Sequence, residues 1–506
     1  MTIVELEPAP DPARCCEQLD ALPYRIFLDS VLKTPGAMSR YSFLCADPVA
    51  LVRSKGAITE HVDLLTGRSH AAAGDALATV QAALAPHMRA PLPDLPPFQG
   101  GAAGYMAYDW ASRLERLPSP RFDDLAMPDV MLGVYDWVIA WDHESSRAWL
   151  ISTGMPEISA DARERRAADR AAEVIALVGR PFHGRAGEQQ AASSKERVAS
   201  SKQRVASSKQ RAASSKQRAM APSFPVDGSD PRLGLRSSFT HAAYLEAVNR
   251  VVEYIRAGDI FQANLSQRFE APLVEDPWAL YRRLRTQNAA PFAAYLDFPG
   301  ALILSASPER FLRVSPGGQV ETRPIKGTRP RGVGPEHDAA LGQALTESAK
   351  DRAENLMIVD LIRNDLSRVC GPGTVRVQEL FALEHFATVH HLVSTVVGQL
   401  RDGTTALDLL RAAFPGGSIT GAPKIRAMEI IAELEPSARG VYCGAIGYLS
   451  VTGALDTSIP IRTAVVSGGR VYLSAGGGIV ADSDAEQEYR ETLDKARGMI
   501  DALIAS

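Results

Sequence analysis

The sequence contains, from residue 351, the stretch Asp351-Arg-Ala-Glu-Asn-Leu-Met-Ile-Val-Asp-Leu-Ile-Arg363. Its apolar residues recur with the spacing of an amphipathic helix. Asp351 and Glu354 stand three residues apart and therefore share one face of that helix. Ser348-Ala-Lys-Asp351 also matches a capping box, so the sequence leaves open whether Asp351 caps the helix or serves as a ligand.

A second acidic helix is predicted near the end of the chain, in Gln487-Glu-Tyr-Arg-Glu-Thr-Leu-Asp-Lys495. Glu488 and Glu491 again stand three residues apart and share one face. If this face meets the face of Asp351 and Glu354, the four carboxylates form a cage of oxygen ligands that suits Mg²⁺. Solvated helix faces are the alternative, because charged residues at this spacing are common on exposed helices.

Helices and strands are interleaved around these two segments from about residue 238 to residue 505. The predicted helices are 241–257, 336–369, 404–413, 422–433 and 484–504. The predicted strands are 260–269, 293–296, 301–305, 319–323, 442–449 and 471–474. Long hairpin-like stretches between them favour an α+β fold, a large multi-layer assembly of sheets and helices, over a doubly wound parallel sheet.

The chain divides into three parts by its composition. Residues 1–183 alternate short apolar strands with turns and a few helices, which predicts an N-terminal lobe. Residues 184–232 are a low-complexity insertion with near-copies of Ser-Ser-Lys-Gln-Arg, too poor in apolar residues for a coiled coil. We expect this insertion to be a tether, with a binding arm as the alternative. Residues 233–506 are predicted to form one domain that holds both acidic helices.

The overall composition limits the classes of function. With 506 residues, of which 45% are hydrophobic and 23% charged, the chain can bury a large core. A formal net charge of −4 gives no general attraction to nucleic acid or to an anionic membrane. The five cysteines lack the spacing of a metal site or a disulfide framework, and no apolar run is long enough to span a membrane. We therefore expect a cytoplasmic protein without a targeting segment.

Two further segments point to chemistry. Lys326 lies between Arg323 and Arg329, and the like charges disfavour its ammonium form. If Lys326 is also buried, its neutral amine becomes available as a nucleophile or base; an exposed cation in a basic turn is the alternative. The glycine run 476–478 follows a predicted strand and precedes a predicted helix, where backbone N–H groups can approach an anion. A flexible turn would explain this run equally well.

The chain also contains the motifs Gly258-Asp-Ile-Phe-Gln262, Ser307-Pro-Glu-Arg-Phe311, 351–365, His391-Leu-Val-Ser394, 417–428, Asp456-Thr-Ser-Ile-Pro-Ile-Arg462 and 476–483. Together they resemble the chorismate-utilising enzymes, which include the large subunits of anthranilate synthase and aminodeoxychorismate synthase and the isochorismate and salicylate synthases. The resemblance implies the fold of anthranilate synthase component I, with a chorismate-binding catalytic domain over 233–506. Phe27-Leu-Asp-Ser30 and Ser39-Arg-Tyr-Ser-Phe43 resemble the amino-terminal lobe of that family.

Two segments resemble one branch of the family. Pro324-Ile-Lys-Gly-Thr328 has a lysine, as aminodeoxychorismate synthases do, where anthranilate synthases carry alanine, and Asn264-Leu-Ser-Gln-Arg268 is also similar to that branch. The resemblance implies a Mg²⁺-dependent subunit that aminates chorismate to 4-amino-4-deoxychorismate, for p-aminobenzoate and folate synthesis. The alternatives are anthranilate synthase component I, of tryptophan biosynthesis, and a non-catalytic chorismate-binding regulatory subunit.

The resemblance also implies roles for single residues. Lys326 attacks C2 of chorismate while the hydroxyl leaves C4, and Glu309 protonates that hydroxyl. His391 orients the ring or assists proton transfer. The implied Mg²⁺ ligands are Glu354, Glu491, Glu488 and, through water, Asp351. The implied substrate contacts are Gly327, Thr328, Ser418, Tyr442, Arg462, Gly476, Gly477 and Gly478.

The resemblance also implies a partner subunit and a second small-molecule pocket. The chain has no amidotransferase cysteine motif, so a separate glutamine amidotransferase subunit is the expected ammonia donor, and neither nucleic acid nor a membrane is an expected partner. Ser30 and the turn Pro291-Phe292-Ala293 match the pocket in which relatives bind tryptophan. A serine and a turn that serve only packing fit these four residues equally well.

Overall fold

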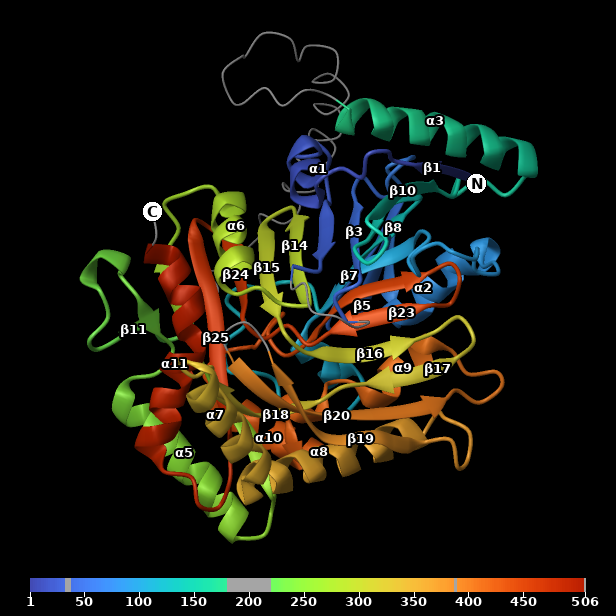
Figure 1. Cartoon of the computed structure of the whole chain (residues 1–506). Helices are drawn as coiled ribbons and strands as arrows, with labels where there is room; N and C mark the ends of the chain where they lie inside the picture. The colour runs from blue at the N-terminus through green and yellow to red at the C-terminus, as the bar shows by residue number, and fades with distance from the viewer. Residues whose placement is uncertain (32–37, 180–219, 386–388, 505–506) are drawn as a thin grey trace.

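The computed structural model describes residues 1–31, 38–179, 220–385 and 389–504. Over these residues the chain forms two large antiparallel sheets that pack face to face, with helices on the outer side of each sheet (Figure 1). The α+β prediction is therefore confirmed. None of the described helices has both the length and the apolar character needed to cross a membrane.

The first sheet contains 13 strands among the described residues. Its longest pair runs from Ala263 opposite Ile479 to Pro272 opposite Arg470. In spatial order the strands are β1 (Thr2–Glu5), β10 (Arg147–Ser152), β9 (Trp137–Asp142), β3 (Tyr41–Cys45), β2 (Ile26–Asp29), β14 (Phe292–Phe298), β15 (Ala301–Ser307), β24 (Thr463–Ser467), β25 (Arg470–Ile479), β13 (Gln262–Pro272), β12 (Arg236–Ser237) and β11 (Phe224–Pro225), and β21 (Gly421–Ala422) also pairs with β13.

The second sheet contains 12 strands among the described residues. In spatial order they are β18 (Ile325–Pro330), β20 (Val389–Gln399), β17 (Gln319–Thr322), β16 (Arg310–Val314), β23 (Leu455–Ser458), β22 (Ala445–Ser450), β7 (Gly101–Met106), β8 (Val130–Tyr135), β4 (Ala50–Lys55), β5 (Ile58–Asp63) and β6 (Ser69–Ala73), and β19 (Arg376–His385) also pairs with β20. The edge at β18 and β20 is the part of this sheet that carries candidate site residues.

Helix ends follow local capping chemistry. Thr240 caps α5 by accepting a hydrogen bond from the N–H of Ala243, and Thr405 and Asp408 form a reciprocal capping box on α9. The described helices are α1 (Pro12–Gln18), α2 (Ala76–Leu84), α3 (Ala160–Val178), α5 (His241–Arg256), α6 (Pro277–Gln287), α7 (Pro335–Glu347), α8 (Ala349–Ser367), α9 (Ala406–Ala413), α10 (Lys424–Leu434) and α11 (Ala485–Ile504).

Apolar side chains fill the space between the layers. One cluster, which includes Phe43 and Val138 from the first sheet and Tyr105 and Ile446 from the second, is buried between the two sheets. A second cluster packs α1, α3, α6 and α11 onto the outer face of the first sheet. Because each strand alternates its side chains between its two faces, both faces of the central strands are buried and the chain forms four layers.

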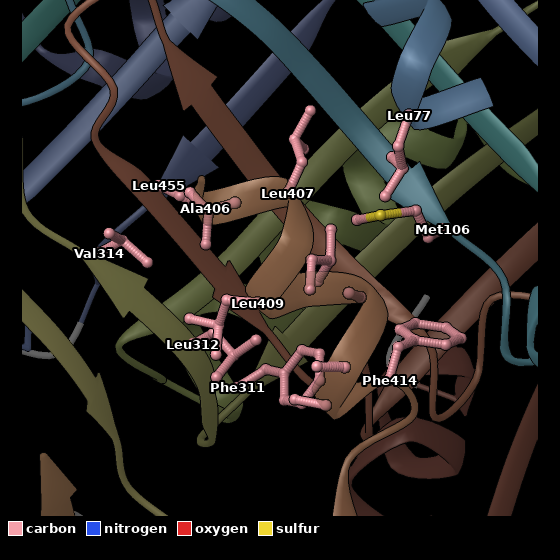
Figure 2. Packing of buried hydrophobic residues seen from close by; sticks show 14 of the residues in the cluster. Leu77, Met106, Phe311, Leu312, Val314, Ala406, Leu407, Leu409, Phe414 and Leu455 are labelled. Atoms are coloured by element: carbon pink, nitrogen blue, oxygen red, sulfur yellow. The ribbon is translucent and has the colours of Figure 1, made fainter. Parts of the chain in front are cut away.

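The third large cluster packs helices onto the outer face of the second sheet. Figure 2 shows buried side chains of this cluster, among them Leu407, Leu409 and Phe414 on or directly after α9 and Phe311 and Leu312 of β16. The ring centroids of Phe311 and Phe414 lie 6.2 Å apart. Burying such side chains contributes about 1.5–3 kcal/mol each to stability. This packing fixes the end of α9 and the chain that follows it, which leads directly into the candidate site.

The predicted elements are largely present, with three corrections. The single predicted helix 336–369 is two helices, because Ser348 has an extended backbone and caps α8. The basic turn that was the alternative for Lys326 is not present, because Lys326 lies in strand β18. The glycine run 476–478 is not a strand-to-helix turn, because β25 continues through it to Ile479.

Both sheets combine strands from the two ends of the chain. In the first, Ala293 of β14 lies opposite Asp29 of β2, and in the second, Ile446 of β22 lies opposite Tyr105 of β7. Residues 1–183 and 233–506 therefore share their cores, and their division into a lobe and a domain stays a prediction about chain organisation. Most of the predicted insertion 184–232 lies outside the described residues.

Candidate active site

A cavity of about 160 Å³ lies where β13 and β25 of the first sheet meet β18 and β20 of the second. The residues that line it come from elements that are far apart in sequence, so the fold assembles the cavity. Ten of the predicted catalytic and substrate-binding residues line it, namely Glu309, Lys326, Gly327, Thr328, His391, Ser418, Tyr442, Arg462, Gly476 and Gly478. Gly477 is the predicted substrate contact that is not among its lining residues.

Glu309 follows β15 and is almost fully buried, with 3% of its surface exposed. Its Oε1 accepts a 2.6 Å hydrogen bond from the Ser418 hydroxyl and a 3.4 Å one from the N–H of Ile325. Burial raises the pKa of Glu309 to about 7, against the opposing effects of these two hydrogen bonds and of Lys326. Near neutral pH this carboxyl group therefore holds a proton that it can donate into the cavity.

Lys326 reaches across the cavity from β18 toward β25. A methyl group placed on Gly478 would lie 3.4 Å from Lys326 Nζ. Burial lowers the pKa of Lys326, and so does the positive charge of Lys495, while Glu354, Glu309 and Glu491 act in the opposite direction. The net lowering increases the fraction of neutral amine, which is the nucleophilic form.

His391 is buried beside Lys326 on the neighbouring strand β20. Its Nδ1 lies 2.9 Å from the Thr328 hydroxyl. Burial lowers its pKa to about 3, and the positive charge of Arg462 adds to the effect. The lowered pKa favours the neutral imidazole, which suits the expected orienting role.

Arg462 brings a positive charge to the opposite wall of the cavity. It is half-buried, and burial lowers its pKa. No carboxylate among the described residues forms an ion pair with Arg462, although an unpaired, partly buried cation is costly. The guanidinium is thus available to a carboxylate of a ligand, which it can bind with two parallel hydrogen bonds. Tyr442, which is buried, lines the same cavity.

The glycines of β25 are explained by close packing against β13. A side chain on Gly476 would collide with the Leu265 carbonyl oxygen, and one on Gly478 with the Gln262 side chain. Beyond Leu473 no described strand pairs with the other edge of β25. The backbone N–H and C=O groups on that free edge are therefore available at the cavity. The sequence predicted such backbone groups at 476–478, and the structure places them in a strand.

The two predicted acidic helix faces lie close enough to interact. Glu491 of α11 raises the pKa of Glu354 of α8, an effect secondary to that of burial and of the neighbouring lysines. A methyl group on Gly477 would lie 2.9 Å from Glu488 Oε2 and 3.4 Å from Glu491 Oε1. Glu488 is buried and accepts a 2.6 Å hydrogen bond from the Ser483 hydroxyl. The alternative that these acidic residues lie on solvated helix faces is therefore wrong for Glu488.

Capping does not account for the acidic residues either. Ser348 caps α8 through the N–H of Asp351, but the Asp351 carboxylate forms a 2.9 Å ion pair with Arg329. On α11 the cap is Asp484, whose side chain accepts a hydrogen bond from the N–H of Gln487. The side chain of Ser483 is bonded to Glu488 instead, because the carboxylate offers a stronger acceptor than the helix end.

The donor set fits Mg²⁺. Glu354, Glu488 and Glu491 supply carboxylate oxygens, and the missing side chain of Gly477 leaves space beside two of them. Glu491 forms a 2.6 Å ion pair with Lys495. Across the described ranges, no three His, Cys, Asp or Glu side chains are as close together as a complete metal site requires. A cation at this position would thus have to draw Glu491 away from Lys495.

Two cavity residues were missed by sequence reasoning. Lys495 donates a 2.9 Å hydrogen bond to the Gly476 carbonyl besides pairing with Glu491, four residues before it. That i, i+4 spacing of opposite charges was a readable signal. Asn264 of β13 lines the cavity, and its buried Nδ2 has no hydrogen-bond partner among the described residues. The sequence identified Asn264 only as part of the motif that resembles one branch of the family, and its place in the cavity depends on the pairing of β13 with β25.

The four residues of the predicted tryptophan pocket also come together. Ser30, Pro291, Phe292 and Ala293 line a separate cavity of about 60 Å³ between β2 and β14. The Ser30 hydroxyl donates 2.7 Å and 3.1 Å hydrogen bonds to the carbonyls of Tyr41 and Pro291. These bonds satisfy the serine within the protein, so binding of tryptophan there stays a prediction.

The raised pKa of Glu309 predicts a pH-dependent stability. Between pH 4.5, the usual value, and about pH 7, the folded state keeps a proton that the unfolded chain has released. The free energy of unfolding should therefore fall as pH rises through this window, by up to about 3 kcal/mol from this group. We expect Glu309→Gln to remove this part of the fall when denaturant unfolding is compared at pH 5 and pH 7.5. Parallel curves for both proteins would contradict it.

Comparisons with known proteins agree with this geometry. The family model for chorismate binding enzymes matches residues 33–501. Aminodeoxychorismate synthase component 1 of Salmonella typhimurium is 42% identical over 92% of this chain and 90% of its own length. Anthranilate synthase component 1 of Thermus thermophilus is 43% identical over 81% of this chain and 79% of its own length.

A solved structure extends the similarity to three dimensions. Anthranilate synthase component I from Streptococcus pneumoniae superimposes with a TM-score of 0.73 at 32% identity, over 92% of this chain and 93% of its own. The predicted fold of this type is thereby confirmed. With a family match over most of its length and relatives above 40% identity, the chain belongs to the family of chorismate binding enzymes.

Proposed function

We propose that this protein is the chorismate-aminating subunit of an aminodeoxychorismate synthase, which makes 4-amino-4-deoxychorismate from chorismate and ammonia. The observation that carries the proposal is the pairing, in one cavity, of a lysine with a lowered pKa and a buried carboxyl group with a raised one. An amine nucleophile and a proton donor are the two groups that this substitution needs. The curated relatives named aminodeoxychorismate synthase component 1 support the choice.

The proposed reaction uses four side chains of the cavity. Arg462 binds a carboxylate of chorismate, and neutral His391 holds the ring in place. Lys326 Nζ forms a bond to C2 while the C4 hydroxyl leaves as water, with its proton supplied by Glu309. Ammonia then bonds to C4 and the C2–Nζ bond breaks. The extra proton of the new amine returns to Glu309, so the enzyme ends as it began.

Mg²⁺ is part of the proposal, with Glu354, Glu488 and Glu491 as its ligands and Asp351 acting through water. When bound, the cation would neutralise a substrate carboxylate and fix the ring. The protein's own residues prepare this position. Ser483 orients Glu488, and the burial of Glu354 and Glu488 raises the pKa of both, so a cation is needed to stabilise their charged forms.

A glutamine amidotransferase is the proposed source of ammonia. The curated relatives are named component 1, which supports the existence of a second component. We also propose a cytoplasmic location, since all five cysteines are free thiols, as expected in a reducing compartment. The role of the cavity beside Ser30 as a tryptophan pocket is retained as part of the proposal.

The product decides between this function and its main alternative. Purified protein is incubated with chorismate, Mg²⁺ and ammonium, and the products are separated with and without added aminodeoxychorismate lyase. We expect p-aminobenzoate only when the lyase is present. Fluorescent anthranilate without the lyase would assign the protein to the anthranilate synthases. Failure to consume chorismate under any of these conditions would favour a regulatory subunit.

The space beside Gly477 predicts a specific metal defect. In Gly477→Ala the new methyl group would press against Glu488 and Glu491, so their carboxylates must move. We expect the Mg²⁺ concentration for half-maximal activity to rise about 10–100-fold, as when groups that orient metal ligands are altered. Gly74→Ala is the matched control, since its methyl group would meet no atom within 4 Å. An unchanged Mg²⁺ requirement in Gly477→Ala would argue against this metal site.

A further inference from the structure

The two oxygens of the Glu309 carboxyl group have different surroundings. Oε1 accepts hydrogen bonds from the Ser418 hydroxyl, at 2.6 Å, and from the N–H of Ile325, at 3.4 Å. Oε2 accepts no hydrogen bond from any of the described residues. Two donors aimed at Oε1 leave that oxygen as the acceptor, so the proton of the neutral acid resides on Oε2. Ser418 thus contacts the acid itself, whereas the sequence implied a contact to the substrate.

Ser418 is held in place from behind by a buried lysine. It lies in a short 3₁₀ helix (Gly417–Ile419) that follows α9. Lys424 Nζ donates hydrogen bonds to the carbonyls of Ala413, at 2.9 Å, and Pro415, at 3.0 Å. Both residues lie between the end of α9 and the 3₁₀ helix that carries Ser418. These bonds join the first turn of α10 to the segment that leads into Ser418. Because Lys424 is only 12% exposed, the bonds are shielded from water.

The charge of Lys424 is balanced by Asp365 on α8. Lys424 Nζ lies 2.6 Å from Asp365 Oδ2, and that carboxylate is 9% exposed. Asp365, Glu309 and Ser418 all line one small cavity of about 10 Å³, and Lys326 is not among its lining residues. We refer to Lys424 and Asp365 as the clamp. Through Asp365 the clamp therefore borders the same small cavity as the acid Glu309 and as Ser418.

The turn that carries Ser418 is tightly packed, so the position of Lys424 affects the position of Ser418. A methyl group on Gly416 would lie 2.7 Å from Ile459 Cδ1, and one on Gly417 would lie 2.9 Å from Leu361 Cδ2. The Thr420 hydroxyl closes the turn with a 3.0 Å bond to the Gly416 carbonyl. Small shifts at Lys424 are therefore passed on to Ser418, because packed segments move as units.

We propose that Ser418 is the positioning residue for the acid Glu309, and that the clamp holds Ser418 in that role. Ser418 keeps the proton on Oε2, the oxygen free to face the cavity, and the clamp keeps the Ser418 hydroxyl within hydrogen-bond distance of Oε1. This inference rests on the proposed function for the identity of the proton acceptor, the C4 hydroxyl. The arrangement of Glu309, Ser418 and the clamp does not depend on it.

The first test is a titration that needs no turnover. The carboxyl band of Glu309 is identified by its loss in Glu309→Gln and followed by infrared spectroscopy as pH is raised in the full-length protein. Removal of a hydrogen bond to the charged form makes ionisation harder, so Ser418→Ala should move the Glu309 titration upward by about one pH unit. Ser237→Ala is the control, because it removes a buried 2.6 Å hydrogen bond, to Gln267, and neither residue lines the cavity. An unmoved titration in Ser418→Ala would overturn the proposal.

The second test asks whether the clamp acts through Ser418. Lys424→Met is combined with Asp365→Asn, so that no buried charge is left alone and the net charge is unchanged. In the wild-type background this pair of changes should raise the Glu309 titration in the same direction as Ser418→Ala. In the Ser418→Ala background it should add nothing further. Equal shifts in both backgrounds would overturn the role of the clamp.

Activity separates this inference from the proposed function. With chorismate, Mg²⁺ and ammonium, Ser418→Ala should lower kcat about tenfold with little change in KM, and the loss of activity at high pH should begin about one pH unit later than in the wild type. If the wild type makes a product other than 4-amino-4-deoxychorismate, the proposed function fails, while the titrations still decide the role of Ser418. A rise in KM with kcat unchanged would return Ser418 to a substrate-binding role.

Discussion

Lys326→Ala should lower kcat for the synthesis of 4-amino-4-deoxychorismate about 10³-fold, which corresponds to ~4 kcal/mol of transition-state stabilisation. The expectation follows from the position of Lys326 in the cavity, beside Glu309 and opposite β25, and from the burial that lowers its pKa. Alanine removes the only group proposed to bond to C2. Chorismate should still bind, because Arg462 is untouched. The measurement is kcat and KM with ammonium as donor.

Loss of the nucleophile must be distinguished from loss of a positive charge. Lys326→Arg keeps a cation in the cavity, but a guanidinium stays protonated at any working pH and cannot attack. We expect Lys326→Arg to be as inactive as Lys326→Ala. Substantial activity in Lys326→Arg would mean that the charge matters and the amine does not. A Lys326→Ala variant that retains activity at low ammonium would contradict the nucleophile outright.

Glu309→Gln is expected to produce the second largest loss, about 10²–10⁴-fold in kcat with KM little changed. Glutamine fills the same space and keeps an acceptor for the Ser418 hydroxyl, but it has no acidic proton to give. The same group predicts the pH dependence of the wild type. Because the acid must be protonated and its pKa in the free protein is about 7, kcat/KM should fall as pH rises through about 7.

The pH profile of the variant provides the control for Glu309. Whatever activity remains in Glu309→Gln should lack the fall near pH 7, since the group that causes it is absent. The concentration of free ammonia must be held constant across the series, because ammonium itself titrates. A Glu309→Gln profile that keeps the same fall would assign it to another residue, and Glu309 would then be a structural carboxyl group.

Local sequence patterns predicted the two acidic helices of the site but not the strand that carries Lys326. The helices with Asp351, Glu354, Glu488 and Glu491 are present, and the spacing of three residues places each pair on one face, as the helical period requires. No strand was predicted over β18, which carries Lys326, and a basic turn was only the alternative to a buried lysine there. Its conformation is imposed by pairing with β20, which no local pattern contains.

The same limit applies to the contacts between site residues. The resemblance implied that Ser418 contacts substrate, but the bond to Glu309 joins residues 109 positions apart and depends on how α9 packs onto β16. The glycines 476–478 indicated close approach to an anion or a turn, whereas collisions with Leu265 and Gln262 account for two of them. Sequence spacing identifies which residues share an element, and tertiary packing decides what they touch.

The most direct measurement of the central claim is the chemical fate of Lys326 during turnover. The protein is mixed with chorismate and Mg²⁺ without ammonia, quenched rapidly, digested and examined by peptide mass spectrometry. We expect a mass increase equal to chorismate less one water on the peptide that contains Lys326, and none in Lys326→Arg. An adduct on another residue, or active enzyme that carries none at any quench time, would contradict attack by Lys326.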